Sequence, residues 1–425
     1  MKLKIHNIGC ISEAEVQLNG LTIVAGSNGS GKSTISKIIF STIKAMANLT
    51  NDKENSRQAL LDKYCRSLYS RLSSAIRMVD NPSMPRFSNE FAKVLWKMRD
   101  SETLKTYLKD VSDYIDGIDS IPPRSKQLAF DDISSITALL SPKGNLAQQL
   151  GSEIRYFVES EFMNQITTNG QEESHVEFQW GENNNDLVEF NVKNDELHMV
   201  KCNLSHGLED ATYVETPLYL PLIDAIRMSS TYVESPQRVF SQPMVPLHVK
   251  DITNKYSLLR AFTEKNESPI LHLIEQVIDG YFVYSEDKHD ILFVQRGDKE
   301  YVPMNVASGI KTMGLLQILL QSYSIGPNKP LLWDEPENHL HPEWQIKFAE
   351  MLVLLAKQGI PVVVSTHSPY FVQSIRYFSA KYSLEKFTDY YLTELNDGIF
   401  KVLHVNDDLN QIFTKLAKCQ YSHYL

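Results

Sequence analysis

One glycine-rich segment of this chain has the residue types and spacing to bind phosphate. Residues 26–33 read Gly-Ser-Asn-Gly-Ser-Gly-Lys-Ser and fit the pattern GxxxxGK[ST] at every position. Glycines let the backbone curl until several N–H groups face one anion, and a following helix adds the positive end of its dipole. Lys32 would bring a compact charge to the β- and γ-phosphates. The Ser33 hydroxyl suits Mg²⁺, a hard cation that prefers oxygen ligands.

A pair of carboxylates follows a short apolar run much later in the chain. Residues 330–333 read Pro-Leu-Leu-Trp and precede Asp334 and Glu335. A strand end would place both side chains at the edge of a parallel sheet, beside the glycine-rich segment. Asp334 is then predicted to hold Mg²⁺ through water, and Glu335 to orient and activate the water that attacks the γ-phosphate in line. Taken alone, the pair indicates a solvated strand end; the upstream glycine segment favours the catalytic interpretation.

A histidine and a serine-glycine pair complete the candidate site. The β-branched run 360–366 predicts a second buried strand, which ends at His367 and should neighbour the Asp334 strand. A histidine there would lie near the γ-phosphate, although most histidines at strand ends are ordinary surface or core residues. Ser308 and Gly309 precede an apolar helix, and Ser308 is expected to cap it and leave N–H groups for an anion. The pair is either a simple cap or a contact to the γ-phosphate held by a second copy of the chain.

The flanking pattern predicts the elements that would position these residues. The apolar run 21–25 is typical of a strand buried on both faces, and 34–43 predicts a helix. From about 48 to 168, apolar residues recur at three- and four-residue steps, which indicates a helical insertion with solvated faces; a DNA-binding arm is the alternative, without a basic stripe to support it. Strand patterns follow and then alternate with helices, which implies parallel sheet. The main strand candidates are 176–180, 187–192, 197–201, 218–220, 281–285 and 290–294.

Composition limits the class of protein. The chain has 425 residues, enough for two or three lobes, with 42% hydrophobic and 22% charged residues, an ordinary globular balance. The cysteines form no CxxC pair, so no zinc cluster or disulfide framework is indicated. A net charge of −10 does not attract nucleic acid by its mean field, but it leaves a local basic groove open. No leader and no run of roughly 18 apolar residues is present, so we expect a soluble cytoplasmic protein without a membrane partner.

These motifs in this order, with DEPENHLHP at the carboxylate pair and STHSP at the histidine, resemble the ABC-type ATPases of the SMC, RecF and OLD branch. The resemblance implies an α/β fold, namely a P-loop ABC-type ATPase head with a mixed or parallel core sheet, an antiparallel β subdomain and a helical insertion. The expected divisions are 1–45 for the first part of the ATP-binding lobe (Walker A), 46–170 for the helical insertion, 171–299 for the β-rich part of that lobe, and 300–425 for the signature, Walker B and switch-histidine lobe with its C-terminal βα tail.

The resemblance also assigns roles. It implies catalytic roles for Glu335 and His367 and metal binding by Ser33 and Asp334. Residues 338–340 fall at the D-loop, so His339 and His341 are expected to be loop and packing residues rather than zinc ligands. The residues it implies for ATP binding are Gly26, Asn28, Gly29, Ser30, Gly31, Lys32, Ser33 and Thr34, with Ser308 and Gly309 reaching the ATP of a sister subunit.

Three departures from the family pattern narrow the prediction. The signature reads ASGIK where transporter-type members have LSGGQ, and the Q-loop cannot be placed, with only Gln127, Gln148 and Gln149 as candidates. The tail after His367 reads as strand 390–395, strand 400–405 and helix 408–417, without the acidic cluster of a nuclease domain. The insertion is too short for a long coiled coil and shows no sustained heptads. What remains looks most like the stand-alone ATPase subunits of Septu-type anti-phage systems.

The resulting hypothesis is an ATPase with ATP and Mg²⁺ as cofactors, which forms a homodimer or a higher homo-oligomer. It would regulate a separate effector, a nuclease or toxin, in bacterial defence. A RecF- or SMC-like DNA-repair or DNA-clamping ATPase is the alternative, so nucleic acid stays open as a partner, and a transport ATPase is the third class. The aromatic and basic residues after His367 would pack or stack on a partner or single strand: Tyr370, Phe371, Arg376, Tyr377, Phe378, Lys381, Tyr382 and Lys386.

Overall fold

The fold is that of a computed structural model of the chain. The chain forms two compact units: unit 1 holds 1–44, 156–231 and 244–425, and unit 2 holds 45–155 and 232–243. The residues that the structure describes are 1–50, 58, 61–62, 64–69, 72, 91–99, 103–119, 121–140, 146–163, 165–181, 185–193, 196–204, 207–223, 225–226, 245–259, 268–288, 290–396 and 398–418.

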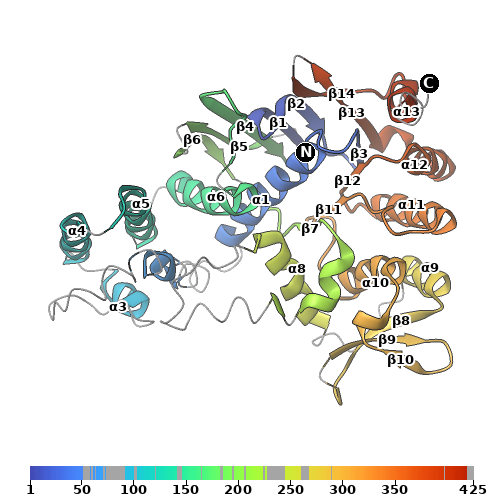
Figure 1. The fold of residues 1–425 in the computed structure, drawn as a ribbon, viewed down its shortest axis with the longest axis horizontal. Coiled ribbons are helices and arrows are strands. Elements are labelled where there is room, and N and C mark those ends of the chain that lie inside the picture. The colour runs from blue at the N-terminus through green and yellow to red at the C-terminus, as the bar shows by residue number, and fades with distance from the viewer. Residues whose placement is uncertain are drawn as a thin grey trace. The chain divides into compact units, whose positions relative to one another are not determined.

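One large mixed sheet forms the centre of unit 1 (Figure 1). Among the described residues it has 11 strands in the order β6-β5-β4-β1-β2-β14-β13-β3-β12-β11-β7. The strands are β1 Lys2–Ile8, β2 Ile11–Gln17, β3 Leu21–Ala25, β4 Glu173–Trp180, β5 Asp186–Lys193, β6 Glu196–Asn203, β7 Thr212–Val214, β11 Leu331–Asp334, β12 Val362–Thr366, β13 Thr388–Asn396 and β14 Ile399–His404.

The parallel half of this sheet runs β13-β3-β12-β11-β7. Every residue of β3, β11, β12 and β7 is buried, as expected where helices cover both faces of a parallel sheet. Thr366 pairs with Ala25, and Asp334 pairs with Ser365. The loops that follow β3, β11, β12 and β7 therefore leave the sheet at one edge.

The other half is antiparallel, in the order β2-β1-β4-β5-β6, and buried residues alternate with more exposed ones along β4 and β5. Strand β14 joins the halves because it pairs antiparallel with β13 and parallel with β2. The predicted mixed α/β fold is thus confirmed, although most antiparallel strands continue the central sheet. A separate antiparallel sheet comprises β8 Gly280–Ser285, β9 Asp290–Gln295 and β10 Lys299–Tyr301.

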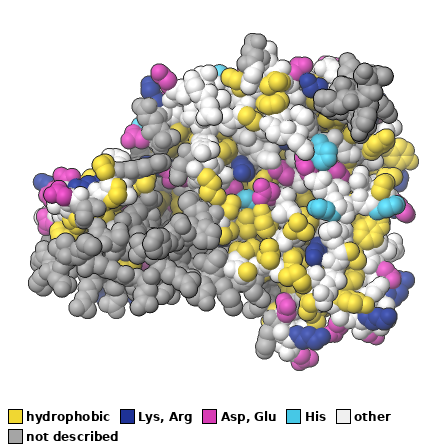
Figure 2. Space-filling view, viewed as in Figure 1, with side chains coloured by type: hydrophobic (Ala, Val, Ile, Leu, Met, Phe, Trp, Pro, Cys, Tyr) yellow, Lys and Arg dark blue, Asp and Glu magenta, His cyan; other side chains and the backbone are white. Residues whose placement is uncertain are grey.

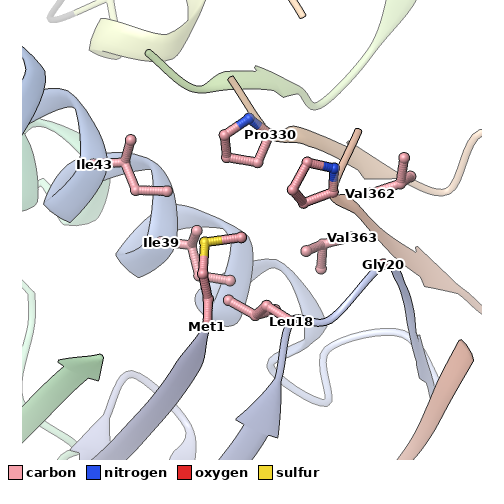
Figure 3. Close-up of a pocket in the computed structure, with 9 residues that line it drawn as sticks. Met1, Leu18, Gly20, Ile39, Ile43, Pro330, Val362 and Val363 are labelled. Carbon is pink, nitrogen blue, oxygen red and sulfur yellow. The ribbon is translucent and has the colours of Figure 1, made fainter. Parts of the chain in front are cut away.

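Helices cover both faces of the parallel strands in unit 1. Helix α1 lies on one face and α11 on the other, where α11 packs against β12 and β3 (Figure 1). Ile39 and Ile43 of α1 line an apolar pocket with Val363 and Pro330, at the amino-terminal ends of β11 and β12 (Figure 3). The helices with residues in unit 1 are α1 Lys32–Thr50, α6 Leu146–Phe162, α8 Leu247–Leu258, α9 Pro269–Ile278, α10 Ser308–Gln321, α11 Pro342–Lys357, α12 Pro369–Lys381 and α13 Asn410–Lys418.

All elements that the structure describes in unit 2 are helices, which confirms the helices predicted there from apolar residues at three- and four-residue steps. It contains α3 Phe91–Met98, α4 Thr103–Asp116 and α5 Pro123–Leu140, together with the carboxyl-terminal end of α1 and the first part of α6. A core of its own includes Leu68, Leu95, Leu108 and Ile136, each at most 3% exposed. The unit therefore buries its own apolar stripes.

One expected strand is wrong and the others are confirmed. Residues 218–220 lie in a 3₁₀ helix, η2 Pro217–Leu222, which begins where the Thr216 side chain accepts a hydrogen bond from the backbone N–H of Leu218. Two prolines in six residues remove the N–H groups that a strand would need. The neighbouring β7 was missed because it has only three residues. In the tail, β13, β14 and α13 match the expected strand, strand and helix.

Candidate functional site

The glycine-rich segment forms the turn between β3 and α1, where Lys32 is the first helical residue. Lys32 is 5% exposed, and its Nζ donates to the carbonyl oxygens of Gly26 at 3.1 Å and Ser27 at 2.9 Å. The same atom lies 3.4 Å from Oε1 of Glu335. Lys32 thus lies close to the carboxylate pair, as predicted. Its ammonium group is bound by carbonyl groups of the same loop that is expected to bind an anion.

Glycine is required in this loop for two reasons. A Cβ on Gly26 would lie 1.8 Å from Oγ1 of Thr393, so the loop and β13 approach too closely for any side chain. Gly29 and Gly31 have φ of +76° and +87°, a left-handed conformation that favours glycine. Ser30 is anchored by a 2.6 Å hydrogen bond from the Thr393 hydroxyl. The curled backbone is therefore fixed by the contacts of the loop with β13.

Asp334 ends β11 among hydroxyl groups. Its Oδ1 accepts from Ser365 at 2.9 Å and Ser36 at 3.3 Å, and its Oδ2 accepts from the Tyr213 hydroxyl at 2.7 Å. Burial raises the pKa of Asp334, against hydrogen bonds that favour the ionised form, including one from Ser33. A buried carboxylate among neutral donors, next to Ser33, is an oxygen-rich environment of the kind that hard divalent cations prefer.

Glu335 has a left-handed backbone conformation, and the pKa of its carboxyl group is lowered. Its φ is +45°, which turns the residue out of β11, and its N–H donates to the Ser365 carbonyl at 3.0 Å. The close contact with His367, at 3.2 Å between Nδ1 and Oε1, is the main reason that the pKa of Glu335 falls to about 2. Asn338 adds a 2.9 Å hydrogen bond, and the charge of Lys32 acts in the same direction.

His367 follows β12 and lies between two carboxylates. Besides Glu335, it faces Glu337, whose Oε1 accepts the His367 backbone N–H at 3.2 Å and also the Thr366 hydroxyl. The close contact with the Glu335 carboxylate raises the pKa of His367, whereas burial raises the pKa of Glu337. The structure thus brings together Lys32, Asp334, Glu335 and His367, the four side chains that the sequence placed at one edge.

Ser308 and Gly309 begin α10, and one expectation about them is wrong. The N-cap is Ala307, and Ser308 is the first helical residue without a side-chain cap. The preceding residues form a short 3₁₀ turn that places the cap one position earlier. A Cβ on Gly309 would lie 3.2 Å from the His339 carbonyl oxygen and 3.3 Å from the Trp344 ring, so glycine permits α10 to pack closely on the segment that follows Glu335.

The other sequence candidates lie as follows. Gln127 is on α5, and Gln148 and Gln149 are on α6, all within unit 2. His339 and His341 are exposed. Of the aromatic residues after His367, Phe371 and Phe378 are buried, which confirms packing for these two, whereas Tyr370 and Tyr377 are 72% and 64% exposed.

Sequence reasoning missed four groups that contact the predicted site residues: Ser36, Tyr213, Glu337 and Ser365. Ser36 stands one helical turn after Ser33, a spacing that places both hydroxyls on one face of α1. Ser365 precedes His367 by two residues and pairs with Asp334 across parallel strands. The position of Tyr213 could not be predicted because the short strand that carries it, β7, was not recognised in the sequence.

The residues present fit a nucleoside triphosphate with a divalent cation. The loop's glycines leave its backbone free of side chains, and a Cβ at Gly26 would occupy the space that Thr393 needs. Lys32 could exchange its two carbonyl partners for phosphate oxygens, and Ser33 and Asp334 offer oxygen ligands. Among the described residues, the one group of His, Cys, Asp or Glu atoms close enough to hold a metal without a ligand is His175, Glu177 and Glu189, elsewhere on the sheet.

Two family models match the chain, and both describe AAA domains. One, described as "AAA domain", matches residues 2–200, and the other, described as "AAA domain, putative AbiEii toxin, Type IV TA system", matches residues 205–373. Each match covers less than half of the chain, and both are matches to an AAA domain. No curated protein matches the chain.

Solved structures with a similar fold include SMC heads and a transporter ATPase. The SMC head domain from Thermotoga maritima is 11% identical, with a TM-score of 0.39, 95% of this chain covered and 98% of that one. An Smc head with an extended coiled coil, bound to the C-terminal domain of ScpA derived from Pyrococcus furiosus, is 11% identical, with a TM-score of 0.40 and coverages of 99% and 98%. An ATP-binding cassette of an ABC transporter in its ADP conformation is 9% identical, with a TM-score of 0.35 and 99% of each chain covered.

Two observations bear on partners. Among the described helices, none combines the length and apolar character needed to cross a bilayer. On the face shown in Figure 2, lysine and arginine side chains of the coloured residues are interspersed with acidic ones, and hydrophobic side chains gather in the middle. The visible part of this face thus has mixed rather than uniformly positive charge.

Proposed function

We propose that the protein binds ATP with Mg²⁺ and hydrolyses it at the edge where β3, β11 and β12 end. The arrangement of Lys32 against the loop carbonyls, 3.4 Å from Glu335, is the observation that carries this proposal. A triphosphate would take the place of the carbonyl partners of Lys32, and the N–H groups of the loop and the amino end of α1 would bind its oxygens.

Each remaining side chain has a role that its environment supports. Mg²⁺, when bound, would neutralise developing phosphate charge, and Ser33 and Asp334 would hold it. Glu335 is ionised and exposed enough to accept a hydrogen bond from water and to orient it for in-line attack. His367, whose pKa is raised, favours the imidazolium form and so suits contact with the γ-phosphate.

Dimerisation around ATP is the second part of the proposal. Ser308 is partly exposed at the amino end of α10, where unpaired backbone N–H groups can bind an anion held by another subunit. Ser308→Arg should abolish an ATP-dependent dimer measured by light scattering, while the protein with ADP stays monomeric in both forms. A dimer that persists in Ser308→Arg would contradict this contact.

The biological role that we propose is regulation of a separate effector, a nuclease or toxin, in bacterial anti-phage defence. The resemblance of the motifs to Septu-type subunits supports it, as does a matching family description that names a putative toxin of a toxin–antitoxin system. The alternative is DNA clamping of the RecF or SMC type. ATP-dependent binding to duplex DNA that falls steeply with salt would favour the alternative.

Lys32→Ala tests the nucleotide site directly. Loss of two charge-assisted contacts should weaken ATP binding by about 100-fold or more, measured by titration with the fluorescent analogue mant-ATP. Lys4→Ala is the matched control, because Lys4 also holds a carboxylate, Glu177 at 2.7 Å, but on the antiparallel half of the sheet. Micromolar binding retained by Lys32→Ala would contradict the proposed site.

A further inference from the structure

A line of buried polar groups leads from Asp334 away from the phosphate loop. The Tyr213 hydroxyl donates to Oδ2 of Asp334 at 2.7 Å, and Tyr213 is fully buried. The ring of Tyr213 lies 4.6 Å, centroid to centroid, from the ring of His248, which is 1% exposed. The tyrosine therefore packs against a histidine that does not itself touch the carboxylate.

His248 is held on both sides by carboxylates. Its Nδ1 lies 2.6 Å from Oε2 of Glu161, and its Nε2 lies 3.3 Å from Oε2 of Glu215. Glu161 also accepts the backbone N–H of His248 at 3.0 Å, which fixes the start of α8. An imidazole with an acceptor at each nitrogen is satisfied when both nitrogens carry protons. Burial lowers the pKa of His248, but the hydrogen bonds to Glu161 and Glu215 outweigh it and raise the pKa to about 8.

Glu215 and Tyr219 fix the far side of this arrangement. Glu215 follows β7, the strand next to β11, and its Oε2 also accepts the Tyr219 hydroxyl at 2.6 Å. Burying charged groups is expensive, and apolar side chains would fill the same space at least as well for stability. A fully buried Glu161 paired with His248 therefore indicates a requirement for fixed geometry at this point in the fold.

We propose that His248 is a positioning residue of the nucleotide site, which fixes Tyr213 against Asp334 and so sets how tightly the site holds a divalent cation. This inference rests on the proposed function. The contacts that Lys32 and the loop backbone would make to phosphate do not involve Tyr213 or His248. Disturbing the pair should therefore weaken the response to Mg²⁺ and leave metal-free nucleotide binding intact.

The test is a titration of MgCl₂ at fixed mant-ATP with Tyr213→Phe, His248→Gln and the double variant. In each, the Mg²⁺ concentration that gives half of the fluorescence change should rise about tenfold, because partners that orient a metal ligand typically change metal affinity by that much. The double variant should be no worse than either single one, since both residues act on one carboxylate. Affinity for mant-ATP in EDTA should stay within about twofold of wild type.

The chain offers a matched control pair. Tyr391 and His404 also have tilted rings in contact, with centroids 5.0 Å apart, and His404 also pairs with a carboxylate, Asp389 at 3.1 Å. Tyr391→Phe and His404→Gln should leave the Mg²⁺ titration unchanged. Thermal melting in EDTA reports folding for all variants, and Tyr213→Phe, which removes one oxygen, keeps the test decisive if His248→Gln folds poorly.

Three results would overturn the inference. Lower melting temperatures with an unchanged Mg²⁺ titration would make both residues purely structural. Additive effects in the double variant would mean that His248 does not act through Tyr213. Wild-type protein that binds mant-ATP equally well in Mg²⁺ and EDTA would contradict the proposed function itself, and this inference with it.

Discussion

Two regions of the same sheet place carboxylates side by side, and they treat the charges differently. On the antiparallel half, Glu177 and Glu189 are directly opposite each other on β4 and β5. Each has a lysine on its outer side, Lys4 at 2.7 Å and Lys201 at 3.1 Å, and these lysines are the cross-strand neighbours in register. We call this row of four residues the charge ladder.

At the parallel edge, three carboxylates lie beside two basic side chains, Lys32 and His367. Asp334 and Glu337 are 6% and 4% exposed, and burial raises the pKa of each. Their hydrogen-bond donors are mainly hydroxyls, and Lys32 is instead paired with Glu335. The charge ladder shows that this sheet can pair each of two adjacent acids with a lysine on the neighbouring strand. At the parallel edge, Asp334 and Glu337 have no such lysine partner among the described residues. This difference is consistent with the proposal that a divalent cation binds at the parallel edge.

The largest expected effect is on the rate of ATP hydrolysis, which should depend on a carboxylate at the parallel edge but not on one in the charge ladder. Glu335→Gln keeps the shape of the side chain but removes its ability to accept a proton from water, so ATP hydrolysis should fall about 100- to 1,000-fold. Glu177→Gln makes the same change in the charge ladder and should leave turnover within twofold, on the order of ordinary surface substitutions. Phosphate release under saturating ATP measures both. Unchanged turnover in Glu335→Gln would remove Glu335 from the mechanism.

A smaller effect should appear in stability, with a sign that depends on the region. The folded pKa of Asp334 lies above its unfolded value, so the ionised carboxylate destabilises the fold at neutral pH, and stability is regained as pH falls through the folded pKa. Asp334→Asn should therefore raise the unfolding free energy in EDTA at pH 7.5. This gain should shrink towards pH 5. Chemical denaturation at both pH values measures it, and a destabilised Asp334→Asn would contradict the account.

The smallest effect concerns the charge ladder. Lys201 is 64% exposed, so Lys201→Gln should destabilise the fold by less than about 1 kcal/mol, in the direction opposite to Asp334→Asn. Because the pair is exposed, the loss should disappear in about 0.5 M NaCl, whereas the effect of Asp334→Asn should persist. Denaturation curves at two salt concentrations distinguish them. A salt-independent loss would show that Lys201 contributes by packing.

The residues that carry local chemical signals were predictable, and the residues that contact them from elsewhere were not. The glycine pattern from Gly26, the strand before Asp334 and the strand before His367 can each be recognised in one short stretch of sequence. The structure brings these three segments together. Tyr213 and His248 reach the site only through the pairing of β7 with β11 and the packing of α8 on β7. Such contacts depend on strand order and helix packing, which no local spacing records.

The backbone of Glu335 has a consequence for how the site should be dissected. A left-handed conformation costs a residue with a side chain about 1 kcal/mol or more, and glycine would adopt it freely. The chain therefore retains an acid at a position where conformation alone would select glycine. Truncation to glycine or alanine would change the local backbone energetics together with the chemistry. Glutamine has nearly the same volume and the same conformational penalty, so it isolates the contribution of the acid.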